Sequence, residues 1–96
     1  MAEGTEVQDN PGARRYEAYV DGGLAGFVAY TRSPGAVELT HTEVDPAYEG
    51  RGVGGALART ALDAAREAGD VVLPSCPFIA GWIQRHPDYQ SLTRGA

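Results

Sequence analysis

The sequence contains no lysine, a single cysteine and no long run of apolar residues. The single cysteine, Cys76, excludes an intrachain disulfide and a metal site built from several cysteines. No apolar run approaches the roughly 20 residues of a membrane-spanning helix, and the first residues lack the basic and apolar regions of a secretory signal. We therefore expect a cytoplasmic protein that binds no metal and no membrane.

Positive charge is also scarce. The basic residues number 8 against 13 acidic ones, which gives a net charge of −5 and a pI of about 4.8. This balance disfavours nucleic acid as a partner, because binding to phosphates needs a basic field. A negative protein is compatible with a cationic partner, such as an amine or a basic protein. We expect a monomer or a weak dimer.

The chain contains enough apolar sequence for one domain. It has 96 residues, of which 43% are hydrophobic and 22% charged, and a chain of this length can bury one modest core. Residues 1–12 are polar and end in Asn10-Pro11-Gly12, so we predict a disordered N-terminal lead-in there. Residues 13–96 are predicted to form the domain.

Three strands are predicted in the first half. Alternating apolar and polar residues predict a strand over 14–20, and apolar runs predict strands over 24–31 and 36–44. The turn-forming segments 21–23 and 33–35 separate these strands, so the three are expected to form an antiparallel meander.

The second half has the pattern of a β-α-β unit. A helix is predicted over 52–68, ended by Gly69, and a short strand over 70–73. The strands before and after this helix should be parallel. A second helix is expected before Pro87, with its apolar residues in the core: Phe78, Ile79, Trp82 and Ile83. The predicted fold class is α/β, with a mixed, mainly antiparallel sheet and a parallel pair around a glycine-led helix.

The turn before the first helix is rich in glycine and is the candidate ligand site. A helix start has free N–H groups and a positive dipole end, and glycine lets an anion approach them closely. The turn lacks the Lys-Ser/Thr ending of a P-loop, and its Gly50-x-Gly52-x-x-Gly55 match to a dinucleotide pattern follows three antiparallel strands. A nucleotide site and a connection without ligand stay open as alternatives. The candidate residues are Glu49, Gly50, Arg51, Gly52, Val53, Gly54, Gly55 and Ala56.

This segment, from Val44 to Gly54, resembles the signature of the GNAT superfamily of acyl-CoA N-acyltransferases, which holds the CoA pyrophosphate. The signature is Gln/Arg-x-x-Gly-x-Gly/Ala, and one frame places Glu49 at its first position. A shifted frame begins at Arg51 and ends at Ala56. Further motifs resemble the short YjdJ-type branch, from about Arg14 to Leu92: His41-Thr42-Glu43-Val44, Cys76-Pro77-Phe78, Gly81-Trp82-Ile83 and His86-Pro87. This resemblance implies a GNAT-like fold with an open acceptor site.

The resemblance also implies a reaction. Acetyl-CoA would serve as the co-substrate and an amine as the acceptor, with an oxyanion donor on the backbone near Val44. A base must first remove a proton from the ammonium group. Glu38, His41 and Glu43 are the candidates, with Glu43 and His41 on one face and Glu38 on the other if the strand is regular. The alternative is that these residues are solvated or structural.

Cys76 precedes the second helix, where a thiolate would be stabilised. Three roles stay open for it: a nucleophile, a proton donor to the leaving CoA thiolate, or a small buried side chain.

From the resemblance as a whole we predict an acetyl-CoA-dependent N-acetyltransferase. The rival interpretation is a CoA-binding or protein-interaction module with little turnover.

Overall fold

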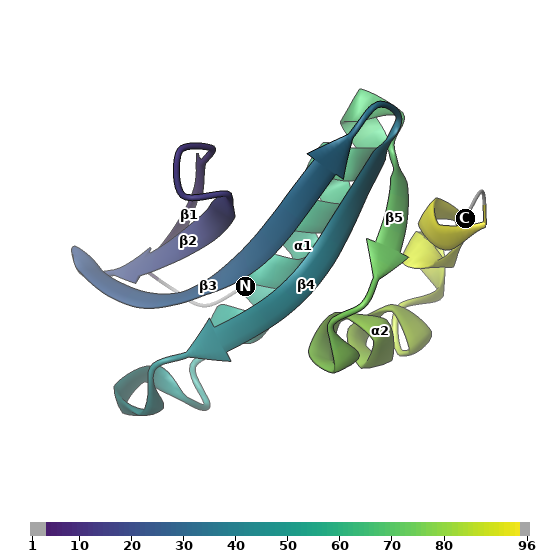
Figure 1. Ribbon diagram of the computed structural model, residues 1–96. Coiled ribbons are helices and arrows are strands. Elements are labelled where there is room, and N and C mark those ends of the chain that lie inside the picture. The colour runs from purple at the N-terminus through teal and green to yellow at the C-terminus, as the bar shows by residue number, and fades with distance from the viewer. Residues whose placement is uncertain (1–3, 95–96) are drawn as a thin grey trace.

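The computed structural model describes residues 4–94, and its strands form one sheet in the order β1-β2-β3-β4-β5 (Figure 1). Neighbouring strands are antiparallel except for β4 and β5, which are parallel. In chain order the elements are β1 (Thr5–Asn10), β2 (Arg15–Val20), β3 (Gly23–Ser33), β4 (Ala36–Val44), η1 (Pro46–Tyr48), α1 (Val53–Ala68), β5 (Val71–Pro74), α2 (Pro77–Gln84) and η2 (Pro87–Thr93). The predicted α/β class with a mixed sheet is confirmed.

The core lies between the sheet and helix α1, which runs behind β3 and β4 in Figure 1. The helix buries one stripe of side chains against the strands, because its apolar residues recur at helical spacing. We call the sheet face that α1 covers the inner face and the opposite one the outer face. Helix α2 adds Ile79, Trp82 and Ile83 to the core, as predicted. Phe78 was also predicted there, but it is 38% exposed.

Both helix ends of α1 follow from glycine. Gly52 is the N-cap with φ of 77°, and Gly69 is the C-cap with φ of 74°. Both are in the left-handed conformation, which residues other than glycine rarely adopt. The N–H of Gly69 donates to carbonyl groups of the last turn. None of the helices described within residues 4–94 is long and apolar enough to cross a membrane.

The N-terminal segment corrects one prediction. Residues 5–10 are not disordered but form strand β1, which pairs along its whole length with β2. A polar sequence suffices for this edge strand, because backbone hydrogen bonds hold it and only Val7 packs against the core. The hydroxyl of Tyr30 also donates to Asp9. Residues 1–3 of the predicted lead-in lie outside the described part of the chain.

Candidate active site

The start of helix α1 presents free backbone N–H groups. Its first intrahelical hydrogen bond runs from Ala56 N–H to the Gly52 carbonyl at 3.0 Å, so the preceding N–H groups have no partner within the helix. Gly52 provides no side-chain cap, and the first turn has no acidic residue. Gly50 has φ of 79°, as glycine permits. The turn therefore has the geometry and the dipole of an anion site.

The side chains of this turn differ in their exposure to solvent. Val53 and Ala56 are buried in the protein, so only their backbone can face a ligand. Glu49 and Arg51 are exposed, and the guanidinium of Arg51 lies over the ring of Tyr48 at 5.7 Å. The one cation of the predicted set is thus held beside the helix start by an aromatic ring.

The absence of a side chain at Gly54 lets Phe78 pack against the start of α1. A Cβ at this position would lie 2.9 Å from Cζ of Phe78, closer than real contacts allow. The missing side chain lets Phe78 of α2 lie across the first turn of α1. This explains why Phe78 is partly exposed: it lies at the helix start and not in the core.

Strands β4 and β5 pair only over a short stretch. Their parallel register ends at Leu39 and Pro74, and the N–H of Cys76 adds one bond to the Leu39 carbonyl at 2.9 Å. Beyond that point β4 continues with β3 as its only paired strand. Asp45 N–H donates to the Ala25 carbonyl of β3 at 2.8 Å. Because N–H directions alternate along a strand, the N–H of Val44 is directed to the opposite, unpaired edge of β4.

A β-bulge at Thr40 changes the faces of β4. His41 pairs with Ala29 and Leu39 with Tyr30, which leaves Thr40 as the extra residue. Side chains that are directly opposite in an antiparallel pair share a face. Glu38 lies opposite Thr31, His41 opposite Ala29 and Glu43 opposite Phe27, and these three β3 residues alternate regularly.

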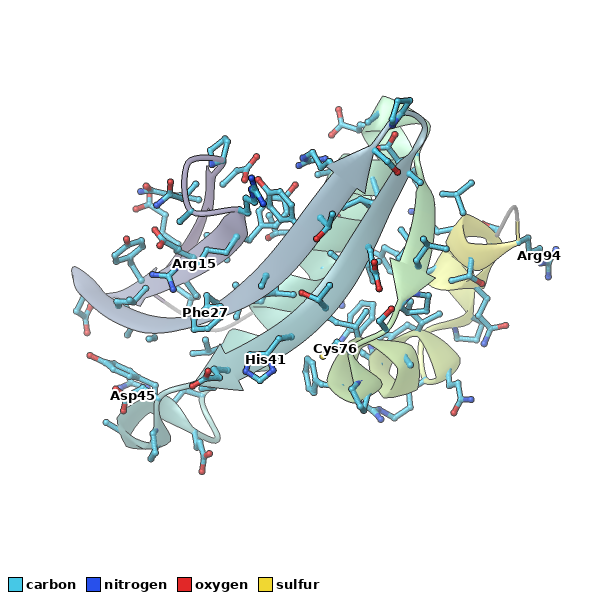
Figure 2. The ribbon with its side chains drawn as sticks, in the orientation of Figure 1. Arg15, Phe27, His41, Asp45, Cys76 and Arg94 are labelled. Carbon is cyan, nitrogen blue, oxygen red and sulfur yellow. The ribbon has the colours of Figure 1, made fainter. Side chains whose placement is uncertain are left out.

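All three candidate bases therefore lie on the outer face. The expectation for a regular strand, with Glu38 on the other face, is wrong because of the bulge. His41 and Phe27 are seen on this face in Figure 2. The His41 Nε2 and Glu43 Oε2 atoms are 3.0 Å apart, and their side chains are 60% and 63% exposed. Glu38 is held separately by the hydroxyl of Ser75, which donates to its carboxylate.

Cys76 lies on the other side of β4. It is the N-cap of α2, is 3% exposed, and its Sγ lies 3.3 Å from the Thr42 hydroxyl. Thr42 pairs with the buried Val28, so it belongs to the inner face. The structure thus brings the three candidate bases to one face and Cys76 to the opposite one, with the end of β4 between them.

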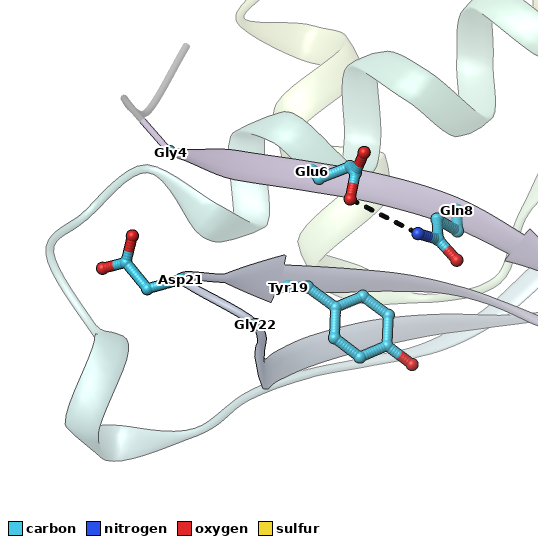
Figure 3. A pocket seen from close by; sticks show the side chains of 6 residues that line it. All are labelled: Gly4, Glu6, Gln8, Tyr19, Asp21 and Gly22. Atoms are coloured by element: carbon cyan, nitrogen blue, oxygen red, sulfur yellow. Dashed lines mark hydrogen bonds between the residues drawn. The ribbon is translucent and has the colours of Figure 1, made fainter.

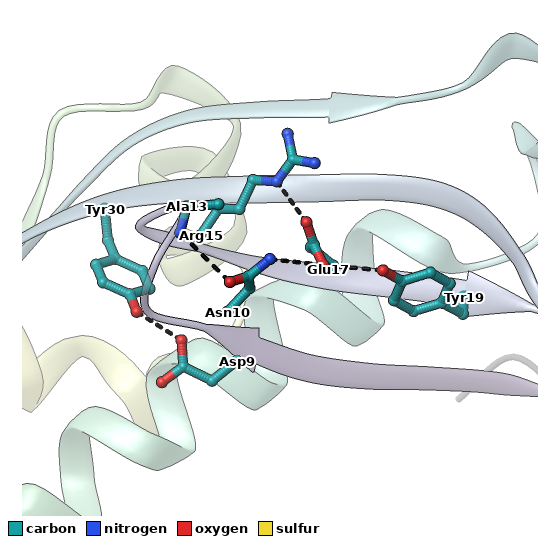
Figure 4. A network of polar contacts seen from close by, with 7 residues as sticks. All are labelled: Asp9, Asn10, Ala13, Arg15, Glu17, Tyr19 and Tyr30. Carbon is teal, nitrogen blue, oxygen red and sulfur yellow. Dashed lines mark hydrogen bonds and ion pairs between the residues drawn. The ribbon is translucent and has the colours of Figure 1, made fainter.

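A polar network beside the candidate bases was missed by sequence reasoning (Figure 4). Glu17 is 6% exposed and accepts hydrogen bonds from Arg15 Nε at 2.7 Å, Tyr19 Oη at 2.9 Å and Asn10 Nδ2 at 3.3 Å. The bond from Arg15, followed by the bond from Tyr19, lowers the pKa of Glu17. The alternating spacing of Arg15, Glu17 and Tyr19 is the signal that places them on one face.

Arg15 links this network to the candidate bases. Its guanidinium lies 4.5 Å above the Phe27 ring, and that ring lies 6.1 Å from the ring of His41, measured between centroids. The charge of Arg15 is already paired with Glu17 at 2.7 Å. The outer face therefore presents His41 and Glu43 beside an aromatic ring that a fixed ion pair supports.

Solved structures share this fold. A GCN5-like protein from Staphylococcus aureus superposes with a TM-score of 0.71 over 94% of this chain and 88% of that one, at 20% identity, which shows the fold alone. The ribosomal-protein-alanine N-acetyltransferase of Brucella melitensis gives a TM-score of 0.55 at 28% identity, over 66% of this chain and 49% of that one.

Sequence comparisons agree with the fold. Protein NATD1 of Mus musculus is 40% identical over 58 residues, which are 60% of this chain and 53% of that protein. The human NATD1 protein matches likewise, over 51% of its length, so the chain spans about half the length of these relatives. The assignment to the short YjdJ-type branch stays a prediction. A family model described as GCN5-related N-acetyl-transferase matches residues 15–92, and the protein therefore belongs to this family.

Proposed function

We propose that the protein transfers an acetyl group from acetyl-CoA to an amine. The observation that carries this proposal is the adjacency of two features: the parting of β4 from β5 and the glycine-led start of α1. A Cβ on Gly26 would lie 3.2 Å from Val44 of β4 and 3.4 Å from Val53 of α1, so the two features are neighbours. The first offers an unpaired strand edge with the Val44 N–H on it. The second offers several free N–H groups for a pyrophosphate. The family membership supports the same pair of roles.

The proposed co-substrate would be held by backbone groups. The N–H groups from Gly52 to Gly55 suit the pyrophosphate, with Arg51 as a charged donor nearby. The departure at Glu49 from the Gln or Arg of the family signature matters little if the backbone does the binding. Val44 N–H is the proposed donor to the negative charge that develops on the carbonyl oxygen during transfer. Acetyl-CoA supplies the activated acetyl thioester.

Proton removal is assigned to the outer face of β4. The acceptor arrives as an ammonium group and must lose a proton before its nitrogen can form the new C–N bond. His41 is the preferred base, because imidazole is the commonest general base in enzymes and the carboxylate of Glu43 lies 3.0 Å from its Nε2 atom, where it can orient the ring. Glu38 is the alternative base, oriented by Ser75. As the C–S bond breaks, the departing thiolate takes up a proton.

Cys76 is proposed to act in packing first. Its burial and its contact with Thr42 support that role. As a proton donor to the thiolate it would act from the inner side of β4, away from the base. Cys76→Ala separates the two roles, because a packing residue affects the free energy of unfolding and a proton donor affects kcat. An acetyl-cysteine adduct, detected by mass spectrometry before amine is added, would instead indicate a nucleophile.

The proposal is tested with Gly52→Val, whose side chain should block the approach of the pyrophosphate. We expect the Kd for CoA, measured by calorimetry, to rise tenfold or more, which is a loss of at least about 1.4 kcal/mol of binding free energy. Gly35→Val is the matched control, because Gly35 has the same φ of 77° in a turn with open space around it. Equal CoA affinity of both folded variants would place the site elsewhere.

The second candidate function is a CoA-binding or protein-interaction module with little turnover. The observation that favours it is the high exposure of His41 and Glu43, whose side chains are 60% and 63% exposed and so keep their contact with water. Release of free thiol from acetyl-CoA in the presence of a panel of amines separates the two functions. Titration with a nucleotide in place of CoA separates both from a nucleotide-binding module.

A further inference from the structure

A hollow of about 250 Å³ lies at the end of β4, beside the candidate bases. It is bounded by the start of β3, the last residues of β4 and the start of η1, in the corner of the sheet where Phe27, His41 and Asp45 are labelled in Figure 2. Phe27 and Glu43 are direct neighbours across the two strands on the outer face. The described lining residues are Leu24, Ala25, Gly26, Phe27, Glu43, Val44, Asp45 and Pro46.

The lining combines an apolar floor with negative charge. Leu24 is 43% exposed, and Phe27 lines the same hollow beside it. The acidic residues Glu43 and Asp45 line the hollow, where Oδ1 of Asp45 also accepts a hydrogen bond from the Ala47 N–H at 2.9 Å, and none of its described lining residues is basic. Arg15 lies over Phe27, but its charge is paired with Glu17. The hollow therefore suits a cation that carries an apolar body.

The hollow is also next to the proposed chemistry. Glu43, which lines it, lies 3.0 Å from His41, and Val44, whose N–H faces the free strand edge, lines it as well. An ammonium group at Glu43 would thus lie next to His41, while its apolar body rests on Leu24 and beside the ring of Phe27, one face of which Arg15 covers. A volume of about 250 Å³ is below the range of about 300–1,000 Å³ that drug-sized ligands occupy.

We propose that this hollow binds the acceptor, and that it selects a small primary amine with an apolar stem or ring. The inference rests on the proposed acetyl transfer and adds the acceptor class to it. The volume of the hollow fits a small amine. The apolar floor favours an aromatic or aliphatic amine over a hydroxylated one, because water must leave Leu24 and Phe27 when the amine binds.

Binding is tested without turnover, by NMR titration of the 15N-labelled protein. The probes are 2-phenylethylamine, the uncharged 2-phenylethanol and the polar ethanolamine. We expect saturable shifts of the Ala25 and Gly26 amides with 2-phenylethylamine and much smaller shifts with the other two. Equal shifts with the alcohol would refute the role of the carboxylates, and equal affinity for ethanolamine would refute the role of the apolar floor.

Turnover is then compared in two matched variants. Leu24→Ser removes part of the floor, and Leu73→Ser changes a leucine of similar exposure, 36%, outside the hollow. We expect Leu24→Ser to lower kcat/KM for 2-phenylethylamine about tenfold, as the loss of apolar substrate contacts does. The ratio of kcat/KM for 2-phenylethylamine to kcat/KM for ethanolamine should fall in this variant and stay at the wild-type value in Leu73→Ser. Equal effects of the two variants would overturn the inference.

Two further outcomes separate this inference from the proposed function. A peptide with an internal lysine that is acetylated with a higher kcat/KM than 2-phenylethylamine would overturn the small-amine class and leave acetyl transfer intact. Normal amide shifts at Ala25 and Gly26 without acetylation of any amine would support the binding site and contradict the proposed function.

Discussion

On the β1–β3 side of the sheet the outer face holds a carboxylate, Glu17, that is paired and almost buried, whereas on β4 the side chains of His41 and Glu43 are mostly exposed to solvent. Glu17 accepts three hydrogen bonds and is almost buried. Glu6 and Gln8 are also joined, at 3.4 Å (Figure 3). His41 and Glu43, by contrast, have only each other as hydrogen-bond partners among the described side chains. A satisfied carboxylate supports the fold, while an accessible one can exchange protons with a substrate.

The two sides of the sheet also differ in the number of strands that pair with each strand. β2 has a paired strand on each side, while the last residues of β4 pair with β3 alone. The size of a hollow does not distinguish the two sides of the sheet. A hollow of about 410 Å³, larger than the one at the end of β4, lies on the β1–β2 side and has no described lining residue from β4, α1 or α2 (Figure 3). Free backbone groups, and not the volume of a hollow, therefore locate the candidate chemistry in this fold.

The largest expected effect tests the side chains of β4. Among Glu38→Gln, His41→Ala and Glu43→Gln, we expect His41→Ala to lower kcat/KM for the amine most, by about 10²–10⁴-fold, as loss of a general base does. Glu6→Gln is the control, because it neutralises an exposed glutamate on the paired side. Near-normal kcat/KM in all three β4 variants would show that water or another residue accepts the proton.

A smaller effect is expected where the two sides of the sheet meet. A Cβ on Gly23 would lie 2.8 Å from the Tyr48 hydroxyl, so Gly23→Ala should displace Tyr48 and the turn that carries Arg51. We expect the Kd for CoA to rise about fivefold, equivalent to about 1 kcal/mol, the low end of the cost of overpacking.

Gly23→Ala with Tyr48→Phe is the matched rescue, since it removes the oxygen that the new Cβ meets. Calorimetry of the wild type, the single variants and the double variant measures the coupling. A double variant as weak as Gly23→Ala alone would show that Tyr48 does not position the turn.

Most of the elements could be predicted from sequence, because alternation, helical spacing and glycine are local signals. Strand β4 was predicted over 36–44 and the structure has it at the same residues; Gly69 ends α1 as predicted. The parallel β4–β5 pair followed from chain order alone.

The rest depended on partners far away in the chain. Strand β1 is polar, so its composition does not predict that it pairs with β2. The bulge at Thr40 depends on how β4 aligns with β3, yet it decides which face Glu38 occupies. Likewise, the contact of Cys76 with Thr42 joins residues that are 34 positions apart. The candidate residues themselves could be named from sequence, while their grouping on two faces of β4 could not.

The smallest effect on CoA binding is expected for Glu17→Gln, which belongs to the paired side and should change stability alone. Hydrogen bonds hold the folded-state pKa of Glu17 below its ordinary value of 4.5. A depressed pKa adds stability above the unfolded pKa, and that stability is lost as the pH falls through the folded pKa. Glu17→Gln should lower the free energy of unfolding by about 1 kcal/mol at pH 7, and by less at pH 3.

Chemical denaturation at the two pH values measures this difference. Glu67→Gln on the exposed side of α1 is the control and should show no pH-dependent change. We also expect Glu17→Gln to leave the Kd for CoA unchanged, because Glu17 lies on the outer face, opposite to the face that α1 covers. A loss of stability that is equal at both pH values would mean that the charge of Glu17 is not involved.

The proposed CoA site depends on the parting of β4 from β5 beside the start of α1, and an NMR titration with CoA tests this site most directly. We predict saturable amide shifts at Val44 and from Gly52 to Gly55, with the amides of β1 and β2 unaffected. Shifts confined to β1 and β2, or saturable CoA binding that leaves Val44 and the Gly52–Gly55 amides unchanged, would contradict it.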